Sequence, residues 1–269
     1  MVVDTGNGTC GPIIEEIMEK IGADYQLLYK EPDGNFPNHL PDPTVLKHIT
    51  KLIETVKNGD FNCGIGLDGD GDRIGVLDEN GEIVWGDVLL AIYAERVLKE
   101  KPGAKIIFEV KCSKGLIERI EELGGTPLMY KTGHSLIKAK MKEENAPLAG
   151  EMSGHIFFAD RYHGYDDALY ASLRLLEILS EDGKLSDYAK KVPKYFSTPE
   201  IRIETTDEKK FYVVEQLKKY FKESYNVIDI DGVRVDFPDG WGLIRSSNTQ
   251  PVLVLRFEAK TEKRLEEIR

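Results

Sequence analysis

Short apolar runs and amphipathic stretches alternate through the first eighty residues of the chain. A short apolar run predicts a buried strand, whereas apolar positions three and four apart predict a helix that buries one face. Strands are expected at residues 2–4, 25–28 and 63–67, helices at 12–21 and about 44–58, and a hairpin turn between two further strands at 78–81. This order of elements predicts an α/β domain.

The alternation continues to about residue 194 and then changes. Helices are expected at residues 87–98, 115–123 and 166–180, with strands at 105–110 and 127–130. After residue 197, a strand at 201–204 and a helix near 208–221 precede strands at 227–230, 232–236, 241–245 and 252–259. Strands that follow one another without intervening helices predict an antiparallel sheet in a small α+β domain.

The whole pattern therefore predicts two consecutive α/β domains with mixed sheets between helices, followed by a smaller α+β domain with an antiparallel sheet. We place the domain limits at residues 1–82, 83–194 and 195–269. A chain of 269 residues is long enough for two or three domains. The sequence contains no internal repeat strong enough to refine this division.

Composition and charge restrict the kinds of partner that these domains are expected to bind. The formal net charge of −11 argues against nucleic acid and against an anionic membrane surface, so an anionic small ligand would need a local basic pocket. No apolar run reaches the length of a membrane span, and the N-terminus lacks a signal-peptide pattern. Cys10, Cys63 and Cys112 form no Cys-x-x-Cys pair, which predicts buried, reduced thiols and a cytoplasmic location. The oligomeric state stays open.

Three aspartates, Asp68, Asp70 and Asp72, stand at every second position in the segment 66–73. In an extended or looped backbone, residues two apart point the same way, so the three carboxylates converge on one small volume. Their repulsion would raise at least one pKa, and a bound cation removes that cost. A few ligands that are all oxygen leave room for water or phosphate, which favours Mg²⁺ over Ca²⁺.

The composition of this acidic segment also fits alternatives to a metal site. A solvated turn would be rich in aspartate and glycine as well. An EF-hand loop is excluded, because its sixth position requires glycine and Arg73 stands there. A haloacid-dehalogenase-type phosphotransferase also places Asp-x-Asp-Gly after an apolar strand, and would use Asp68 as its nucleophile. Lys131, Asp166 and Asp167 would supply its later motif elements, so this alternative stays open.

Residues 6–11 match the Gly-x-Gly-x-x-Gly pattern of a dinucleotide-binding turn between a strand and a helix. A lone match is weak evidence, because any tight turn from strand to helix uses glycine for the same backbone reason. We therefore favour a structural role for this turn. Nothing else in the chain supports a nicotinamide enzyme.

Three later loops carry polar side chains next to expected strands. Segments 131–134 (Lys-Thr-Gly-His) and 151–155 (Glu-Met-Ser-Gly-His) follow strands, and strand ends are where open α/β folds bind ligands. Glu151 and Ser153 could hold adjacent hydroxyls of a sugar. Segment 245–251 (Arg-Ser-Ser-Asn-Thr-Gln-Pro) links two strands and offers a dense set of donors, as a phosphate-binding loop requires. A plain hairpin turn has no need for that whole combination.

With these motifs in this order, the chain resembles the α-D-phosphohexomutases, and most of all their bacterial phosphomannomutase/phosphoglucomutase members. The likeness covers essentially the whole chain and includes segments 33–39, 109–112 and 164–167. It implies a reversible transfer of phosphate between C1 and C6 of glucose or mannose. The implied route uses a phosphoserine and glucose 1,6-bisphosphate or mannose 1,6-bisphosphate as the intermediate.

The resemblance also implies a role for each candidate residue. The three aspartates would hold Mg²⁺, Arg73 would lie beside the transferred phosphoryl group, and Lys111 would lend further positive charge. His134 and His155 would lie near the reacting groups, without an assignment of acid or base. The residues that would bind the hexose phosphate are Lys131, Glu151, Ser153, Arg245, Ser247, Asn248 and Thr249.

One departure from the family matters for activity. Family members carry a further N-terminal α/β domain whose Ser-His-Asn-Pro loop supplies the phosphorylated serine, and these 269 residues contain no such sequence. We therefore expect the chain to hold the second to fourth domains, truncated at its start and end, and to bind metal and sugar phosphate weakly without turnover. A non-catalytic sugar-phosphate-binding module stays open for the same reason. The haloacid-dehalogenase alternative leaves the loop at Arg245 unexplained.

Overall fold

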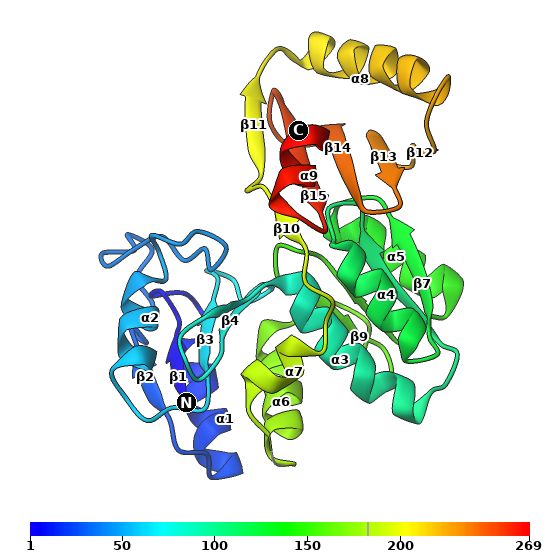
Figure 1. Cartoon of the computed structure of the whole chain (residues 1–269). Coiled ribbons are helices and arrows are strands. Elements are labelled where there is room, and N and C mark those ends of the chain that lie inside the picture. The colour runs from blue at the N-terminus through cyan, green and yellow to red at the C-terminus, as the bar shows by residue number, and fades with distance from the viewer. Residues whose placement is uncertain (182) are drawn as a thin grey trace.

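The computed structural model describes residues 1–181 and 183–269, which form three units, each built around one sheet (Figure 1). The first unit, in blue and cyan, lies beside the second, in green, and the third, in yellow to red, lies above the second in this view. The units follow one another along the chain. This arrangement confirms the expected order of two α/β units and one α+β unit.

The first unit is a mixed five-stranded sheet with the order β2-β1-β3-β4-β5. Strand β1 pairs in parallel with β2 and β3, β4 pairs antiparallel with β3, and the edge strand β5 pairs antiparallel with β4. Its elements are β1 (Val2–Asp4), α1 (Gly11–Ile21), β2 (Gln26–Leu28), α2 (Thr50–Lys57), β3 (Gly64–Leu67), β4 (Ile74–Leu77) and β5 (Ile83–Val84).

The second unit repeats this topology with different residues. Its sheet has the order β7-β6-β8-β9, with three parallel strands and one antiparallel edge strand. A shared topology requires only similar apolar patterns and turns, which explains why the sequence shows no clear repeat. The elements are α3 (Gly86–Glu100), β6 (Lys105–Glu109), α4 (Lys114–Glu122), β7 (Thr126–Tyr130), α5 (His134–Glu144), β8 (Leu148–Gly150), β9 (Ile156–Phe158), α6 (Ala168–Leu179) and α7 (Leu185–Lys190).

The third unit has an antiparallel sheet with the order β10-β15-β14-β13-β12, and β11 also pairs with β15. This confirms the expected α+β character of the last segment. Its elements are β10 (Phe196–Ser197), β11 (Ile201–Glu204), α8 (Asp207–Lys222), β12 (Val227–Ile228), β13 (Val233–Phe237), β14 (Gly240–Ser246), β15 (Val252–Ala259) and α9 (Glu262–Ile268).

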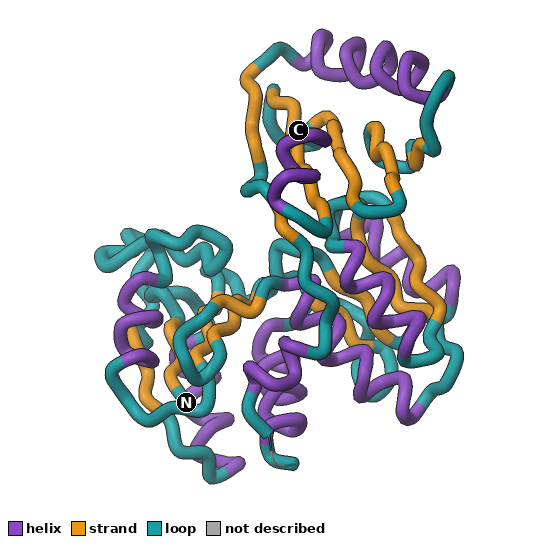
Figure 2. Tube along the Cα trace, in the orientation of Figure 1, coloured by secondary structure: helices purple, strands orange, loops and turns teal. Residues whose placement is uncertain are grey.

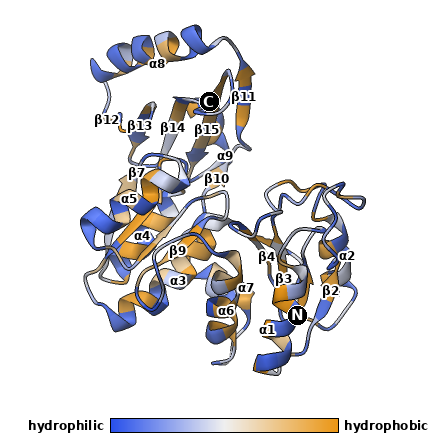
Figure 3. Cartoon of the chain, turned by 180° about the vertical axis from the view of Figure 1, so that it is seen from behind, coloured by the Kyte–Doolittle hydropathy of each residue, from blue (hydrophilic) through white to orange (hydrophobic). Residues whose placement is uncertain are grey.

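One apolar core continues from the first unit into the second. It includes residues of α1 and β3 on one side and of α3 and α6 on the other. Helix α3 is buried along most of its length, and Figure 3 shows apolar colour along the strand β3. Cys10, Cys63 and Cys112 are buried free thiols, as expected. Among the described residues, no helix combines the length and apolar character needed to cross a membrane.

The prediction of a helix at residues 44–58 is wrong for the first part of that range, because α2 begins only at Thr50. Asp42 accepts hydrogen bonds from the Thr44 backbone N–H at 3.0 Å and from its hydroxyl at 2.6 Å. The N–H groups of Val45, His48 and Ile49 bond to carbonyls three residues earlier, so this segment forms turns and α2 begins only at Thr50. Figure 2 shows the resulting long loop between β2 and α2 in teal.

Helices α5 and α7 and the strand β9 were not expected. Helix α5 buries only Ile137 and Met141, so its apolar pattern is too sparse to indicate a helix. Helix α7 and strand β9 contain six and three residues, which is too short for a periodic signal. His134, one of the candidate residues, is the first residue of α5.

Candidate functional site

The acidic loop lies at the carboxyl end of β3 and is built around Asp68. The buried Asp68 Oδ1 accepts the backbone N–H groups of Gly71, Asp72 and Arg73 at 2.9, 3.0 and 3.1 Å. Arg73 Nε donates to Asp68 Oδ2 at 2.8 Å, and Arg73 Nη1 donates to Asp42 at 3.2 Å. A single carboxylate therefore holds the loop in its tight turn.

Asp68, Asp70 and Asp72 each place one oxygen within 4.8 Å of the other two. Burial and the Asp68 carboxyl raise the pKa of Asp72 to about 6. Burial would also raise the pKa of Asp68, but hydrogen bonds from Asp72 and Arg73 lower it overall. Converging oxygen donors of this kind fit the small, hard Mg²⁺ ion, which would relieve the repulsion between them.

Mg²⁺ binding at this loop should weaken below about pH 6. The pKa of Asp72 is raised from 3.8 to about 6, so Asp72 takes up a proton as the pH falls through 6, and that proton competes with the cation. We expect the apparent affinity to fall about tenfold per pH unit below this value. Calorimetric titration with Mg²⁺ at about pH 5 and about pH 7.5 measures the effect, and equal affinities would contradict it.

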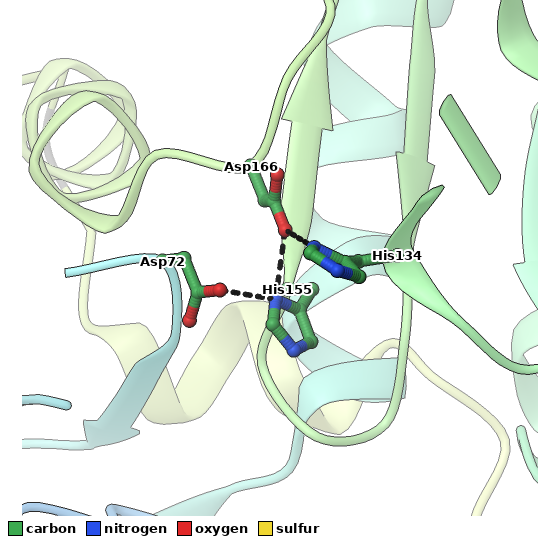
Figure 4. Close-up of side chains that lie close together, drawn as sticks. All are labelled: Asp72, His134, His155 and Asp166. Atoms are coloured by element: carbon green, nitrogen blue, oxygen red, sulfur yellow. Dashed lines mark hydrogen bonds and ion pairs between the residues drawn. The ribbon is translucent and has the colours of Figure 1, made fainter. Parts of the chain in front are cut away.

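Next to the acidic loop, four side chains from separate segments meet: Asp72, His134, His155 and Asp166 (Figure 4). Asp166 Oδ2 lies 2.9 Å from His134 Nδ1 and 3.0 Å from His155 Nδ1. Asp72 Oδ2 lies 3.6 Å from His155 Nδ1. Burial would lower the pKa of His155, but the carboxylates of Asp166 and Asp72 raise it overall. The two candidate histidines are thus brought together beside the acidic loop.

A backbone contact fixes the second unit against the first at this point. The Ile74 N–H donates to the Gly154 carbonyl at 3.1 Å, and Arg73 pairs with His155 as an antiparallel bridge. Gly154 has a φ of 95°, and a Cβ there would lie 2.3 Å from the Ile74 carbonyl oxygen. Glycine is therefore required for the close approach of the two loops.

Glu109, at the end of β6, connects three loops of the second unit. Its side chain is fully buried, and Oε2 accepts the Thr132 hydroxyl at 2.7 Å and the Lys111 N–H at 3.1 Å. Oε1 accepts the Met152 N–H at 3.3 Å and lies 3.7 Å from Lys111 Nζ. Sequence reasoning missed this residue. The only local feature is an acidic side chain at the end of an otherwise apolar strand, and this feature does not by itself indicate a buried bridging role.

Glu151 joins the two loops that were expected to bind sugar. The buried Glu151 carboxylate accepts the Gly133 N–H at 2.6 Å, which links segment 151–155 to segment 131–134. Burial and the nearby Glu109 raise the pKa of Glu151. Within residues 1–181 and 183–269, no hydrogen bond involves the side chains of Lys131 or Ser153. These two side chains therefore remain available to a ligand.

Asp231 connects the third unit to the second and was also missed from the sequence. Its Oδ2 accepts Arg245 Nε at 3.0 Å and the Thr132 backbone N–H at 2.9 Å. Arg245 is buried at the end of β14, where it begins the 245–251 loop. The carboxylate therefore orients the guanidinium and places the loop beside segment 131–134.

Lys210 supports the 245–251 loop from α8. Its nearly buried ammonium group donates to the carbonyls of Ser247 and Gln250 at 2.8 and 3.0 Å. Ser247 Oγ accepts the backbone N–H groups of Thr249 and Gln250 at 3.3 and 3.2 Å. Asn248 and Thr249 are exposed at the tip of the loop. Hydrogen bonds from Lys210 and to Ser247 thus fix the backbone of the loop, while its tip is exposed to solvent.

Candidate residues from all three units lie along one continuous path of contacts. The path runs through Asp72, His155, Glu151, Gly133, Thr132, Asp231 and Arg245. Lys111 lies beside this path, close to Glu109 and Glu200.

The glycine turn at residues 6–11 supports the acidic loop. The Thr9 N–H donates to the Gly69 carbonyl at 3.0 Å, and a Cβ at Gly8 would lie 2.8 Å from the same oxygen. A Cβ at Gly11 would lie 1.7 Å from the Lys30 carbonyl oxygen. These close approaches explain the glycines without a dinucleotide.

Family models match three consecutive parts of the chain. Residues 1–81 match alpha/beta/alpha domain II of phosphoglucomutase/phosphomannomutase, residues 85–196 match its alpha/beta/alpha domain III, and residues 200–269 match its C-terminal domain.

Individual proteins are similar over the same length. The chain is 51% identical over 271 aligned residues to the phosphomannomutase/phosphoglucomutase of Pseudomonas aeruginosa, and 46% identical to the phosphoglucomutase of Neisseria gonorrhoeae. All of this chain is covered in both matches, but it spans only 58% and 59% of those proteins. A crystal structure of a phosphoglucomutase/phosphomannomutase family protein from Burkholderia thailandensis matches with a TM-score of 0.93 and 46% identity, over 99% of this chain and 57% of that one.

Proposed function

Because the chain belongs to the phosphoglucomutase/phosphomannomutase family, we propose that it forms the metal-binding and hexose-phosphate-binding part of a mutase. The proposed reaction interconverts hexose 1-phosphate and hexose 6-phosphate through a phosphoserine and glucose or mannose 1,6-bisphosphate. The 269 residues contain no Ser-His-Asn-Pro loop. We therefore propose that they bind Mg²⁺ and a hexose phosphate in the cytoplasm but do not turn over unaided.

The observation that carries this proposal is the single path of contacts from the acidic loop to the 245–251 loop. A mutase must hold both ends of one small substrate, a reacting phosphate at one end and a second phosphate or hydroxyl at the other. The path joins carboxylates, sugar-binding groups and a phosphate-type loop across all three units, which we propose to be domains with limits at 1–82, 83–194 and 195–269.

We propose that Asp68, Asp70 and Asp72 hold the Mg²⁺ ion. The bound ion would neutralise charge on the phosphoryl group during transfer. Arg73, which donates to Asp68 Oδ2, would lie beside that phosphoryl group. A structure of the N-acetylphosphoglucosamine mutase of Aspergillus fumigatus in complex with GlcNAc-6P and magnesium shares this fold, with a TM-score of 0.71 and 15% identity.

The remaining candidate residues would bind and orient the sugar. Glu151 and Ser153 would hold two hydroxyls, with Lys131 and Lys111 adding positive charge around an anionic substrate. The carboxylates of Asp166 and Asp72 raise the pKa of His155, and we propose that this histidine and His134 hold or move a proton at the reacting hydroxyl. The nonreacting phosphate would be bound by Arg245, Ser247, Asn248 and Thr249.

A haloacid-dehalogenase mechanism fits the geometry poorly. Both oxygens of Asp68 are engaged, one by three backbone N–H groups and the other by Arg73, and the side chain is buried. A nucleophilic carboxylate needs a free oxygen facing the phosphorus atom. Asp68 is therefore better suited to hold the loop and a cation.

Replacing Arg245 by alanine should lower the affinity for glucose 1-phosphate about 10- to 100-fold, because a buried, oriented guanidinium makes charge-assisted bonds to phosphate. Calorimetric titration of the chain with this sugar phosphate in the presence of Mg²⁺ measures the change and tests the proposed function. Arg161→Ala is the matched control, because Arg161 is exposed and pairs with Glu177. An equal loss in both variants would contradict a phosphate-binding role for Arg245.

A further inference from the structure

Two imidazole nitrogens and two carboxylate oxygens converge beside the acidic loop, in the cluster drawn in Figure 4. They come from Asp72 on the acidic loop, His134 at the start of α5, His155 before β9 and Asp166 before α6. One ligand-type atom from each residue lies within 4.8 Å of the other three. We propose that this cluster is a second metal site, for a borderline ion such as Zn²⁺, distinct from the all-oxygen loop.

The spacing of the donor atoms fits a tetrahedral ion. Zinc bonds to nitrogen and oxygen of about 2.0–2.1 Å in a tetrahedron place neighbouring ligand atoms roughly 3.3 Å apart. Asp166 Oδ2 is 2.9 Å from His134 Nδ1 and 3.0 Å from His155 Nδ1, and Asp72 Oδ2 is 3.6 Å from His155 Nδ1. These distances bracket the tetrahedral value, so small side-chain shifts complete the site.

The donor set selects the class of ion. Imidazole nitrogen suits Zn²⁺ and similar transition metals, whereas Mg²⁺ requires oxygen ligands in an octahedron. Asp68 and Asp70 contribute only oxygen, and they belong to the neighbouring loop. The two sites therefore differ in chemistry although they share Asp72.

One buried ring nitrogen in this cluster lacks a hydrogen bond. His155 Nδ1 has no partner of hydrogen-bonding geometry among the described residues, although Asp166 Oδ2 lies 3.0 Å away. A buried polar atom without a partner is costly and calls for an explanation. A cation placed between the nitrogen and the carboxylates supplies one.

The residues around the cluster orient one of the proposed ligands and leave the ion a route from solvent. Lys138 donates to the second oxygen of Asp166 at 3.1 Å, which orients that carboxylate. Asp166 is almost buried, whereas half of the His134 side chain is exposed, so an ion can enter from the side of His134.

Occupation of this site would have a consequence for the proposed function. An ion bound here would use Asp72, which is also a proposed Mg²⁺ ligand, and both histidines, which are proposed to act on the sugar. It should therefore compete with Mg²⁺ and with hexose phosphate. This consequence depends on the proposed function. Binding of the ion itself does not, because it needs neither the sugar phosphate nor the serine loop.

Titration of the chain with Co²⁺, followed by its visible absorption, tests the site. Tetrahedral Co²⁺ absorbs far more strongly than six-coordinate Co²⁺ on an all-oxygen loop, so the spectrum reports the coordination geometry. We expect a strong absorption spectrum that is lost when Zn²⁺ displaces the bound Co²⁺. The double variant His134→Ala/His155→Ala should lose this spectrum and bind Zn²⁺ at least about 100-fold more weakly.

Two control variants separate the sites. His163→Ala removes an exposed histidine outside the cluster and should change nothing, while Asp70→Asn should weaken Mg²⁺ binding and leave the Co²⁺ spectrum intact. The single variant His134→Ala alters a half-exposed side chain, so it reports on the site even where the double variant does not fold. A weak, six-coordinate spectrum of the unaltered chain, or a strong one that survives His134→Ala and the double variant, would overturn the proposal.

Discussion

An alanine in place of Gly154 should lower the free energy of unfolding by about 3 kcal/mol or more. Gly154 has a φ of 95°, which strains any residue with a Cβ, and that Cβ would lie 2.3 Å from the Ile74 carbonyl oxygen. The clash separates the two loops that hold His155 against Asp72. Urea-induced unfolding measures the stability, and the same variant should lose affinity for glucose 1-phosphate.

The control for this variant is Gly103→Ala. Gly103 has a φ of 77°, but a Cβ at this position would have no atom within 4 Å, so only backbone strain of roughly 1 kcal/mol is expected. The difference between the two variants isolates the contact between the first and second units. Equal losses of stability would show that this contact contributes nothing.

Replacing Asp68 by asparagine should weaken Mg²⁺ binding at least about 100-fold and also destabilise the acidic loop. The substitution removes a charged ligand. An amide NH₂ group would also face either the backbone N–H groups of the loop or Arg73 Nε, and each donor left without an acceptor costs about 1–3 kcal/mol. Calorimetric titration with Mg²⁺ and urea-induced unfolding measure the two effects.

Asp70→Asn distinguishes the two roles of Asp68. Asp70 is exposed, and no hydrogen bond involves its side chain within the described parts of the chain. Its replacement should therefore weaken Mg²⁺ binding without a loss of stability. Unchanged Mg²⁺ binding by Asp68→Asn would refute the metal site, and equal stability of the two variants would refute the structural role of Asp68.

The fold could largely be predicted from the apolar pattern, because most buried elements leave a periodic signal. Strands β1, β6 and β15 and helices α1 and α3 lie close to the expected limits. The predicted start of α2 was wrong because hydrogen bonds from Thr44 to Asp42 hold a turn there. Helix propensity takes no account of side-chain hydrogen bonds that compete with the helix in this way. Helix α5 was missed because a helix with one narrow buried stripe resembles a polar loop.

The candidate site was predictable where several polar or charged residues stand within a few positions of one another, as in the acidic loop or the 245–251 loop. Glu109, Asp231 and Lys210 were not predictable in this way. Each connects segments far apart in sequence, such as Thr132 and Arg245 at Asp231. A lone carboxylate or ammonium group carries no local pattern that indicates a buried bridging role, so only the tertiary structure identifies it.

A ³¹P spectrum of glucose 1-phosphate, recorded with this chain, Mg²⁺ and a trace of glucose 1,6-bisphosphate, tests the central claim most directly. We predict that the glucose 1-phosphate signal broadens, because the loops bind it, and that no new signal appears, because the serine loop is not among these residues. A signal that stays sharp would contradict the binding site. The appearance of glucose 6-phosphate would contradict the requirement for the serine loop, and free phosphate would favour a phosphatase reaction at Asp68.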